Sequence, residues 1–441
     1  MTEGPDGKER GAFGVLANDG ISAGKGTPAG VDPPVSIDTA SSPVLGSPNQ
    51  EDDPMKKNLI LAAPIAALAI AGCGSAASTS SKPTASATTA PVAATSTAAT
   101  AATSFLGPLK KVSTVASTVP ADGDVNPYGI VDVPTTTGKL HAHDLLISNF
   151  NDKANNQGTG TTIVEITPAG KHSLFANIKA STLPGPLPGG VGLTTALSVL
   201  PGGYVVVGSL PTTNGKSATA RYGGLIVLNS VGKAVSTITG PQIQGPWDMI
   251  SSTKGNTTTL FVSNALNGGA AKGVHTIDNS TVLRIRIDSG VGQPPKVLGE
   301  TVIANKIPWR DDPNALVIGP TGVALAPNGT LYLADTLDNR IAAIPHALTR
   351  TTAAPAGGRT VSVGGKLIQP LGLTLAPNGD ILTANAGNGN IVETTPAGKQ
   401  LVARTADKKT GAGSLFGLVV NPAGNGIYFV DDGDNTLKLL H

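Results

Sequence analysis

From Phe105 onward the chain alternates short apolar runs with turns rich in glycine, proline, asparagine and aspartate. The runs are rich in β-branched residues, and no segment keeps an apolar 3.6-residue period over about 11 residues. Apolar runs bounded by turn residues are typical of β-strands, whereas an amphipathic helix needs the longer period. The pattern therefore predicts an all-β domain over residues 105–441.

The apolar runs belong to a unit that repeats about every 50 residues, a period typical of repeat architectures. The clearest copies read strand, Pro-Asn-Gly-type turn, strand, and occupy residues 319–336, 369–386 and 414–433. Three weaker copies lie upstream. The second strand of each copy ends in a polar residue, and these residues are Asn149, Ser209, Asn264, Asp335, Asn385 and Asp431. Six copies predict six structural units.

Each copy continues with a third apolar run, and most copies have a fourth, such as 233–238 and 399–405. The last copy stops at His441 without a fourth run. Residues 110–115 (KKVSTV) resemble the fourth run KAVSTI and follow no strands of their own. We expect this N-terminal strand to complete the last unit, so that no sheet edge stays open.

Motifs in the fourth copy resemble the NHL repeat. They are Pro320-Thr321-Gly322, Pro327-Asn328-Gly329, Leu331-Tyr332-Leu333-Ala334-Asp335 and Asn339-Arg340-Ile341. Proteins with this repeat form six-bladed β-propellers. The resemblance therefore implies a six-bladed β-propeller over 105–441 with its last blade closed by the N-terminal strand. It does not imply one activity, because propellers host many unrelated functions.

An apolar run, Leu59–Ala71, follows Met55-Lys56-Lys57 and precedes Gly72-Cys73. A membrane-spanning helix needs about 20 apolar residues, so this run is too short to span. A basic start, a short apolar run and small residues are the parts of a secretory signal. Ile70-Ala71-Gly72-Cys73 resembles the lipobox of bacterial lipoproteins. The resemblance implies a signal peptide over 55–72, lipidation of Cys73, and an anchored protein of the bacterial cell envelope that faces the periplasm or the cell exterior.

Two polar segments flank the signal. Residues 1–54 are rich in Gly, Pro, Ser and Asp and show no strand or helix period, a composition that predicts disorder. We expect translation to start at Met55, which places residues 1–54 upstream of the protein. After the cysteine, residues 73–104 consist almost entirely of Ala, Ser and Thr and predict a flexible tether between the lipid and the domain.

Composition limits the classes of partner. Cys73 is the only cysteine, so its lipidation leaves no thiol for a disulfide or a Cys-ligated metal. A net charge of +2, with 3 % aromatic residues, argues against nucleic-acid binding. We expect the membrane as a partner through the lipid anchor, together with an unidentified protein or small-molecule ligand.

In a propeller blade, the start of the innermost strand and the end of the second strand lie at the same end. The insertions 150–161, 265–281 and 299–318 belong to that end, and loops on a rigid scaffold often carry function. We therefore predict ligand binding on this loop-rich face. The candidate residues are Trp247, Asp248, Asn264, His275, Trp309, Arg310, Asp335, Asn385 and Asp431. Two structural alternatives stay open: packing of Trp247 between blades, and Asx-turns for the polar residues.

Lactonases of the gluconolactonase and regucalcin type have related six-bladed propellers and bind a divalent metal through a Glu at an inner-strand start. The corresponding positions here are Pro127, Trp247, Pro320 and Pro370, with no Glu. Asp248, Asn264 and Asp335 are candidates for a partial oxygen site for an ion such as calcium.

Two other metal motifs are weaker. The stretch 431–435 (DDGDN) lacks the spacing of an EF-hand and predicts a polar turn. The sequence His141-Ala142-His143 falls on the opposite face and predicts loop histidines. We therefore predict a binding protein without a certain cofactor. The alternative is a metal-dependent hydrolase or lyase, similar to the lactonases, at the channel mouth.

The lipobox predicts the N-terminus of the mature protein. We expect intact mass or N-terminal sequencing to place it at Cys73 with lipid attached, because cleavage precedes the lipidated cysteine in this family. A mature product that retains residues 1–54 contradicts the prediction.

Overall fold

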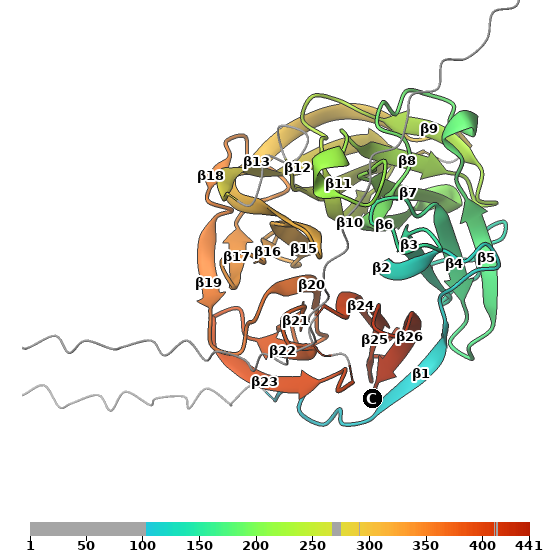
Figure 1. Ribbon diagram of the computed structural model, residues 1–441. Helices are drawn as coiled ribbons and strands as arrows, with labels where there is room; N and C mark the ends of the chain where they lie inside the picture. Colours follow the sequence, from blue (N-terminus) through green and yellow to red (C-terminus); the bar gives the residue numbers. More distant parts are fainter. Residues whose placement is uncertain (1–102, 267–274, 291, 410, 412) are drawn as a thin grey trace, which may run out of the picture. The chain divides into compact units, whose positions relative to one another are not determined.

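The computed structural model describes residues 103–266, 275–290, 292–409, 411 and 413–441. The segments 1–54, 55–72 and most of 73–104, including Cys73, lie outside these residues. The described residues form six antiparallel sheets arranged as blades around a central axis (Figure 1). Within them, no helix has the length and apolar character needed to cross a membrane.

Blades 1 to 3 follow one another along the chain. Blade 1 consists of β2 (Val125–Asp132), β3 (Leu145–Asn151), β4 (Thr162–Ile166) and β5 (His172–Asn177). Blade 2 consists of β6 (Leu193–Leu200), β7 (Tyr204–Ser209), β8 (Gly224–Leu228) and β9 (Ala234–Ile238). Blade 3 consists of β10 (Pro246–Lys254), β11 (Thr257–Asn264), β12 (Ile277–Asp288) and β13 (Lys296–Asp312), joined by β14 (Leu316–Ile318) and β18 (Ala354–Pro355).

Blades 4 to 6 complete the ring. Blade 4 consists of β15 (Pro320–Leu325), β16 (Leu331–Asp335), β17 (Arg340–Ile344) and β19 (Arg359–Val363). Blade 5 consists of β20 (Pro370–Leu375), β21 (Ile381–Asn385), β22 (Asn390–Thr394) and β23 (Gln400–Thr405). Blade 6 consists of β24 (Leu415–Val420), β25 (Ile427–Asp431), β26 (Thr436–Leu440) and β1 (Val112–Ser117). Three single-turn 3-10 helices are Ala180–Thr182, Pro201–Gly203 and Ser217–Thr219.

The predicted six-bladed propeller is confirmed, including closure of its last blade. β1 pairs antiparallel with β26, so that Val112 lies opposite Leu440 and Ser117 opposite Thr436. Backbone hydrogen bonds between Lys111 and His441 extend this pairing to the C-terminus. The first and last strands of the propeller therefore build one blade and close the ring (Figure 1).

The apolar core lies between neighbouring blades. One cluster joins Leu146 of blade 1 to Val207 of blade 2, and further clusters join each following pair of blades. Both sides of the inner strands are covered in this way, so removal of apolar surface from water holds the blades together. The core thus fixes the positions of the loops at both ends of the ring.

A repeated glycine lets the innermost strands approach closely. A Cβ atom on Gly372 would meet the carbonyl oxygen of Phe416 at 2.1 Å, and one on Gly417 would meet that of Tyr128 at 2.6 Å. Any side chain there would push the inner strands of adjacent blades apart. Packing between blades therefore accounts for the repeated glycine.

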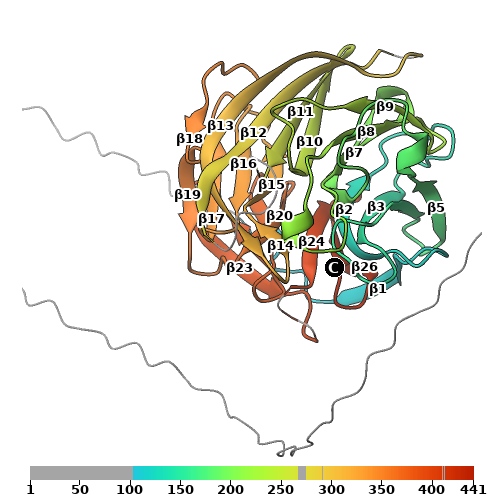
Figure 2. The same ribbon diagram turned by 45° about the horizontal axis from the view of Figure 1, so that its top comes forward.

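One expectation about the insertions is wrong. Residues 299–318 form no long loop: most of them extend β13, which pairs with β12, and the rest turn back as β14. Figure 2 shows β12 and β13 running side by side as long strands. Backbone pairing satisfies this segment's polar groups, so it is a rigid extension of blade 3.

The segment 103–111, which precedes β1, is fixed onto blade 5 through the buried Glu393. The Glu393 carboxylate accepts the backbone N–H groups of Phe105 and Leu106 at 2.8 and 2.9 Å, and the Ser104 hydroxyl. Arg404 in turn donates to the carbonyl oxygens of Gly107 and Leu109. We call residues 103–111 the N-terminal strap.

Replacing Glu393 is expected to loosen the strap. Glu393→Ala removes the acceptor of several buried donors, and an unsatisfied buried group costs about 1–3 kcal/mol. We expect urea unfolding to show a loss of that size for Glu393→Ala and a smaller loss for Glu393→Gln, whose amide oxygen still accepts. Equal stability of Glu393→Ala and the unchanged protein contradicts this role.

Candidate functional site

A cavity of about 390 Å³ lies at the end of the ring where the innermost strands begin. Its floor consists of Tyr128, Trp247, Leu371 and Phe416. Its lining includes polar side chains from blades 1, 4, 5 and 6, and these are Asn126, Thr336, Gln369 and Asp432. A concave apolar floor with a few polar groups is the usual form of a small-molecule site.

The floor separates the mouth cavity from a narrow channel along the axis. Trp247, Leu371 and Phe416 line both spaces. The Tyr128 ring stacks on Phe416 with centroids 4.0 Å apart and on Phe150 at 4.5 Å, and it meets Trp247 edge-on at 5.8 Å. These rings hold each other in place, so the floor is a preformed apolar surface.

The β13–β14 hairpin covers one side of the cavity, where Asp312, Asn314 and Val317 line it. Loops from two other blades hold the hairpin. Gln157 of blade 1 donates from its amide nitrogen to the carbonyl oxygen of Asn314 at 2.7 Å, and the Ser217 hydroxyl of blade 2 donates to that of Leu316 at 2.8 Å. The cavity therefore has a cover fixed from three blades.

Two residues that line the cavity, Asn126 and Asp432, carry an acceptor group without a hydrogen-bond partner among the described residues. One such group is the buried Asn126 Oδ1. The other is the Asp432 carboxyl, for which the structure shows no side-chain hydrogen bond or ion pair. Burial, with a smaller effect of the neighbouring Asp431 charge, raises the pKa of Asp432 to about 6. Burial and, to a lesser degree, the Asp432 charge also raise the pKa of Tyr128. A donor or a cation in the cavity would satisfy both acceptors.

Of the nine predicted site residues, Trp247 alone lines the mouth cavity. Trp309 is buried in the core, where its Nε1 donates to Asn279 Oδ1. Arg310 forms an ion pair with Asp312 at 3.1 Å. His275 is exposed and does not line the cavity. The predicted face is the one that holds the cavity, but most of the predicted side chains do not reach into it.

The polar residue near the end of each second strand serves its own blade. All six are fully buried, and they are Asn149, Ser209, Asn264, Asp335, Asn385 and Asp431. Asn264 Oδ1, for example, accepts the N–H groups of Gln244 and Gly245 at 3.0 and 2.8 Å, just before β10. The segments before β2 and β20 are held by the amide nitrogens of Asn149 and Asn385, which donate to the carbonyl oxygens of Thr118 and Lys366. Before β6, the Ser209 hydroxyl accepts the N–H of Gly192 and donates to the carbonyl oxygen of Gly190. These residues therefore fix the entry to the first strand.

Asp335 pairs with a cation from the next strand. Arg340 donates to Asp335 Oδ2 from Nε at 3.1 Å and from a terminal nitrogen at 2.6 Å. Burial outweighs these contacts and raises the pKa of Asp335 to about 6. Burial of the Asp335 carboxylate therefore has a cost in free energy, and Arg340 is the main group that offsets it.

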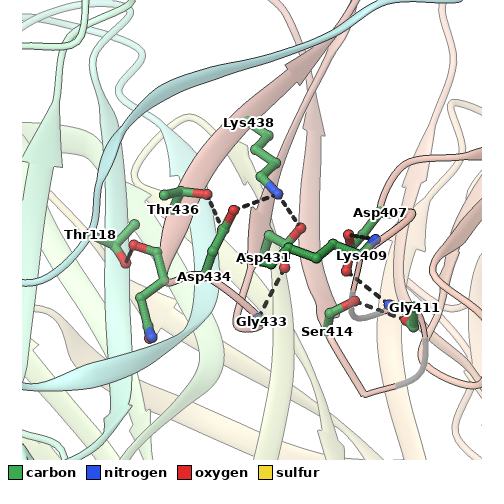
Figure 3. Close-up of polar contacts among 11 residues, drawn as sticks. Thr118, Asp407, Lys409, Gly411, Ser414, Asp431, Gly433, Asp434, Thr436 and Lys438 are labelled. Atoms are coloured by element: carbon green, nitrogen blue, oxygen red, sulfur yellow. Dashed lines mark hydrogen bonds and ion pairs between the residues drawn. The ribbon is translucent and has the colours of Figure 1, made fainter.

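Asp431 is paired in the same manner (Figure 3). Lys438 Nζ lies 2.7 Å from Asp431 Oδ2 and 2.9 Å from Asp434 Oδ2. Asp431 Oδ1 accepts the N–H of Gly433 at 3.0 Å, which is an Asx-turn. Lys438 thus pairs with two of the three carboxylates in the stretch 431–435, which forms a polar turn.

Asp248 lines the channel below the floor. It occupies the blade 3 position where other blades have the repeated glycine, and its Oδ2 accepts the N–H of Val323 in blade 4 at 3.0 Å. Burial outweighs this hydrogen bond and raises the pKa of Asp248 to about 7. Asp248 therefore connects two blades across the space that a glycine leaves elsewhere.

The three residues considered for a metal do not fit one. Asn264 Oδ1 already accepts two backbone N–H groups, Asp335 is bound by Arg340, and Asp248 accepts a backbone N–H. A divalent ion needs several free oxygens directed at one point. We therefore derive no chemistry from a metal at the mouth.

The lining residues Thr336, Ala386 and Asp432 follow directly after Asp335, Asn385 and Asp431 in the sequence. The register of the repeat can identify this position, but the residue type varies from blade to blade. A search for repeated polar residues therefore misses it. The rings of Tyr128 and Phe416 are likewise identifiable, because each stands just before a repeated glycine.

Comparison with solved structures finds six-bladed propellers of the gluconolactonase type. A gluconolactonase from Xanthomonas campestris has 13 % identity and a TM-score of 0.45, covering 76 % of this chain and 90 % of that chain. A putative gluconolactonase has 16 % identity and a TM-score of 0.43, covering 76 % of this chain and 92 % of that chain. Virginiamycin B lyase from Staphylococcus aureus has 16 % identity and a TM-score of 0.41, covering 75 % of this chain and 85 % of that chain. No protein-family description and no curated protein matches the sequence.

The Asp335–Arg340 pair gives a stability prediction. Arg340→Met leaves a buried charge unpaired and is expected to cost about 3 kcal/mol in urea unfolding at pH 7.5. Asp335→Asn in the same chain should recover at least about 1 kcal/mol, because asparagine already occupies this position in three blades.

The pH dependence supplies the control. Loss of Arg340 raises the pKa of Asp335 further, and a group whose pKa is raised on folding adds stability at low pH that is lost as pH rises. The deficit of Arg340→Met should therefore shrink between pH 7.5 and pH 5. A double variant no more stable than Arg340→Met shows that the Asp335 charge is not the cause.

Proposed function

We propose that this protein binds a small organic cation in the mouth cavity. The observation that carries the proposal is the unpaired Asp432 carboxyl beside a preformed aromatic floor. Aromatic faces attract cations, and a carboxylate in a half-enclosed cavity adds a charged acceptor. Asn126 Oδ1 offers a second acceptor for an ammonium hydrogen. A ligand with an apolar body and a protonated amine matches all three groups.

The size of the cavity supports a small ligand. About 390 Å³ lies within the usual range of small-molecule sites and is too little for a folded partner. The hairpin cover, held by Gln157 and Ser217, limits access from one side. The preformed floor reduces the ordering cost of binding.

We further propose that the propeller acts at the cell envelope. The support is the lipobox-like stretch before Cys73, the apolar run 59–71 and the Ala/Ser/Thr-rich segment that follows. An acylated N-terminus holds such a protein at the membrane, since more than one acyl chain gives stable anchoring. The NHL-like repeat is part of the same proposal, as a resemblance of sequence.

An enzymatic role is the second candidate, and the raised pKa of Asp432 favours it. A carboxyl with a pKa of about 6 in a cavity has the property of a general base near neutral pH. This role requires turnover, for example proton release from an aldonolactone in a pH-stat, that increases with pH through about 6 and stops in Asp432→Asn. Without turnover, the binding role stands alone.

Amine binding should depend on Asp432 and on pH. We propose titration of the protein with phenethylamine and with 2-phenylethanol while following the fluorescence of Trp247, which lines the cavity. At pH 7.5 the amine should bind about tenfold more tightly than the alcohol, since a hydrogen bond to a charged group is worth about 1.5 kcal/mol or more. The preference should fade by pH 5, because Asp432 becomes protonated.

Two variants control this experiment. Asp432→Asn should remove both the preference for the amine and its pH dependence without loss of stability, because the native carboxyl has no partner to lose. Asp434→Asn removes an exposed carboxylate two residues away and should change neither. Equal binding of amine and alcohol, or an unchanged preference in Asp432→Asn, overturns the proposal.

A further inference from the structure

A cluster of titratable groups lies at the opposite end of blade 1. The His141 Nδ1, an Asp144 carboxylate oxygen and a Glu165 carboxylate oxygen all lie within 4.8 Å of one another. His141 and Asp144 belong to the connection between β2 and β3, while Glu165 lies near the end of β4. This connection is remote from the mouth, because the first strand of each blade starts at the mouth and ends at the opposite face of the ring, where the connection lies.

We propose that His141, Asp144 and Glu165 bind a divalent transition-metal ion, with zinc as the expected ion. His141 Nδ1 lies 3.4 Å from Glu165 Oε2 and 3.7 Å from Asp144 Oδ2. Ligand atoms on a tetrahedral zinc, each bonded at about 2.0–2.1 Å, are separated by roughly 3.3 Å. The two separations from the imidazole are therefore within a few tenths of an ångström of those on zinc, and the two carboxylate oxygens lie within 4.8 Å of each other.

Backbone contacts hold the ligands in place. The N–H of Val133 donates to the carbonyl of Asp144 at 2.9 Å, and the N–H of His143 donates back to Val133 at 2.8 Å. The N–H of His141 donates to Glu165 Oε1 at 2.9 Å, which leaves Oε2 directed at the imidazole. The arrangement is therefore built by the fold and does not depend on a mobile loop.

Blade 5 contains the equivalent pair of carboxyls and shows what they require. Asp380 directly precedes β21 as Asp144 precedes β3, and Glu393 occupies in β22 the place of Glu165 in β4. There the N-terminal strap donates to Glu393 from three groups, and Asp380 shares a hydrogen bond with it. Blade 5 thus satisfies its buried carboxyls with protein donors.

Among the described residues, no segment donates to the carboxyls of blade 1 as the N-terminal strap does in blade 5. The Asp144 and Glu165 side chains are 11 % and 5 % exposed, so both are largely buried. The Asp144 carboxylate has no hydrogen-bond donor among the described residues, and its ion-pair partner there is His141 alone. Lys171 acts on its charge only from a greater distance. The two carboxylates and the imidazole together offer three ligand atoms to a cation placed between them.

The chemistry of the three ligands selects the ion. Carboxylate oxygens alone would suit calcium or magnesium, but an imidazole nitrogen suits zinc and its neighbours in the first transition row. A cavity of about 460 Å³ adjoins the cluster and gives a water molecule access to the fourth position. Three protein ligands with one open position is a common zinc arrangement.

The test is calorimetric titration of the full chain with Zn²⁺ at pH 7.5, in a Cys73→Ser background so that the thiol does not compete. We expect one strong site. His141→Gln and Glu165→Gln should each weaken it by roughly tenfold or more, since even outer-shell partners contribute 10–100-fold to metal affinity. The His141 side chain is 62 % exposed, so its replacement should leave folding intact.

His143→Gln is the matched control, because His143 lies two residues from His141 and outside the cluster. It should bind Zn²⁺ as the parent does, and Zn²⁺ should raise the melting temperature of the parent and of His143→Gln but not of His141→Gln. Absence of Zn²⁺ binding, equal weakening by both histidine variants, or Ca²⁺ binding as tight as that of Zn²⁺ overturns the proposal.

Discussion

Pairing of β1 with β26 is the contact on which the rest of the structure depends. A propeller holds its shape only as a closed ring, and here the ring closes where Val112–Ser117 meets Thr436–Leu440. Blade 6 combines the first strand of the propeller with its last three, and it supplies Asp432 and Phe416 to the mouth cavity. The N-terminal strap strengthens the closure, because Glu393 holds the segment that leads into β1. Stability of the strap and geometry of the cavity are therefore linked through one blade.

The fold could be predicted from the sequence because its strongest constraints repeat. Each blade must pack against the next, so an apolar second strand recurs in every blade and the close-packed glycine recurs in blades 1, 4, 5 and 6. Gly372 and Gly417 have little freedom, since a Cβ atom at either would meet a neighbouring backbone oxygen within 2.6 Å. The β13–β14 hairpin belongs to blade 3 only, so no repeat revealed it. Its position over the cavity depends on contacts with Gln157 and Ser217, which are distant from it in the sequence.

The cavity residues were missed for a physical reason. Polar residues that recur in every blade do the same task in every blade, and here that task is holding the entry to the first strand. Asn264 and Asn385 are buried for this purpose and cannot meet a ligand. The next residue along faces the axis and is free to differ, as Thr336 and Asp432 do. In a repeat protein, the residues that make a binding site specific are therefore expected next to the repeated polar position and not at that position.

Charge compensation separates the structural carboxyls from the candidate functional ones. Burial disfavours the ionised form of every carboxyl considered, and what differs is the partner. Asp335 has Arg340, Asp431 has Lys438, and Glu393 has the donors of the strap. Asp432 has no such partner in the described part of the chain, and Asp144 has only an imidazole. Because the fold gives each of the first three a partner, the lack of a comparable partner makes the other two significant: an uncompensated carboxylate is retained at a cost in stability unless something binds to it.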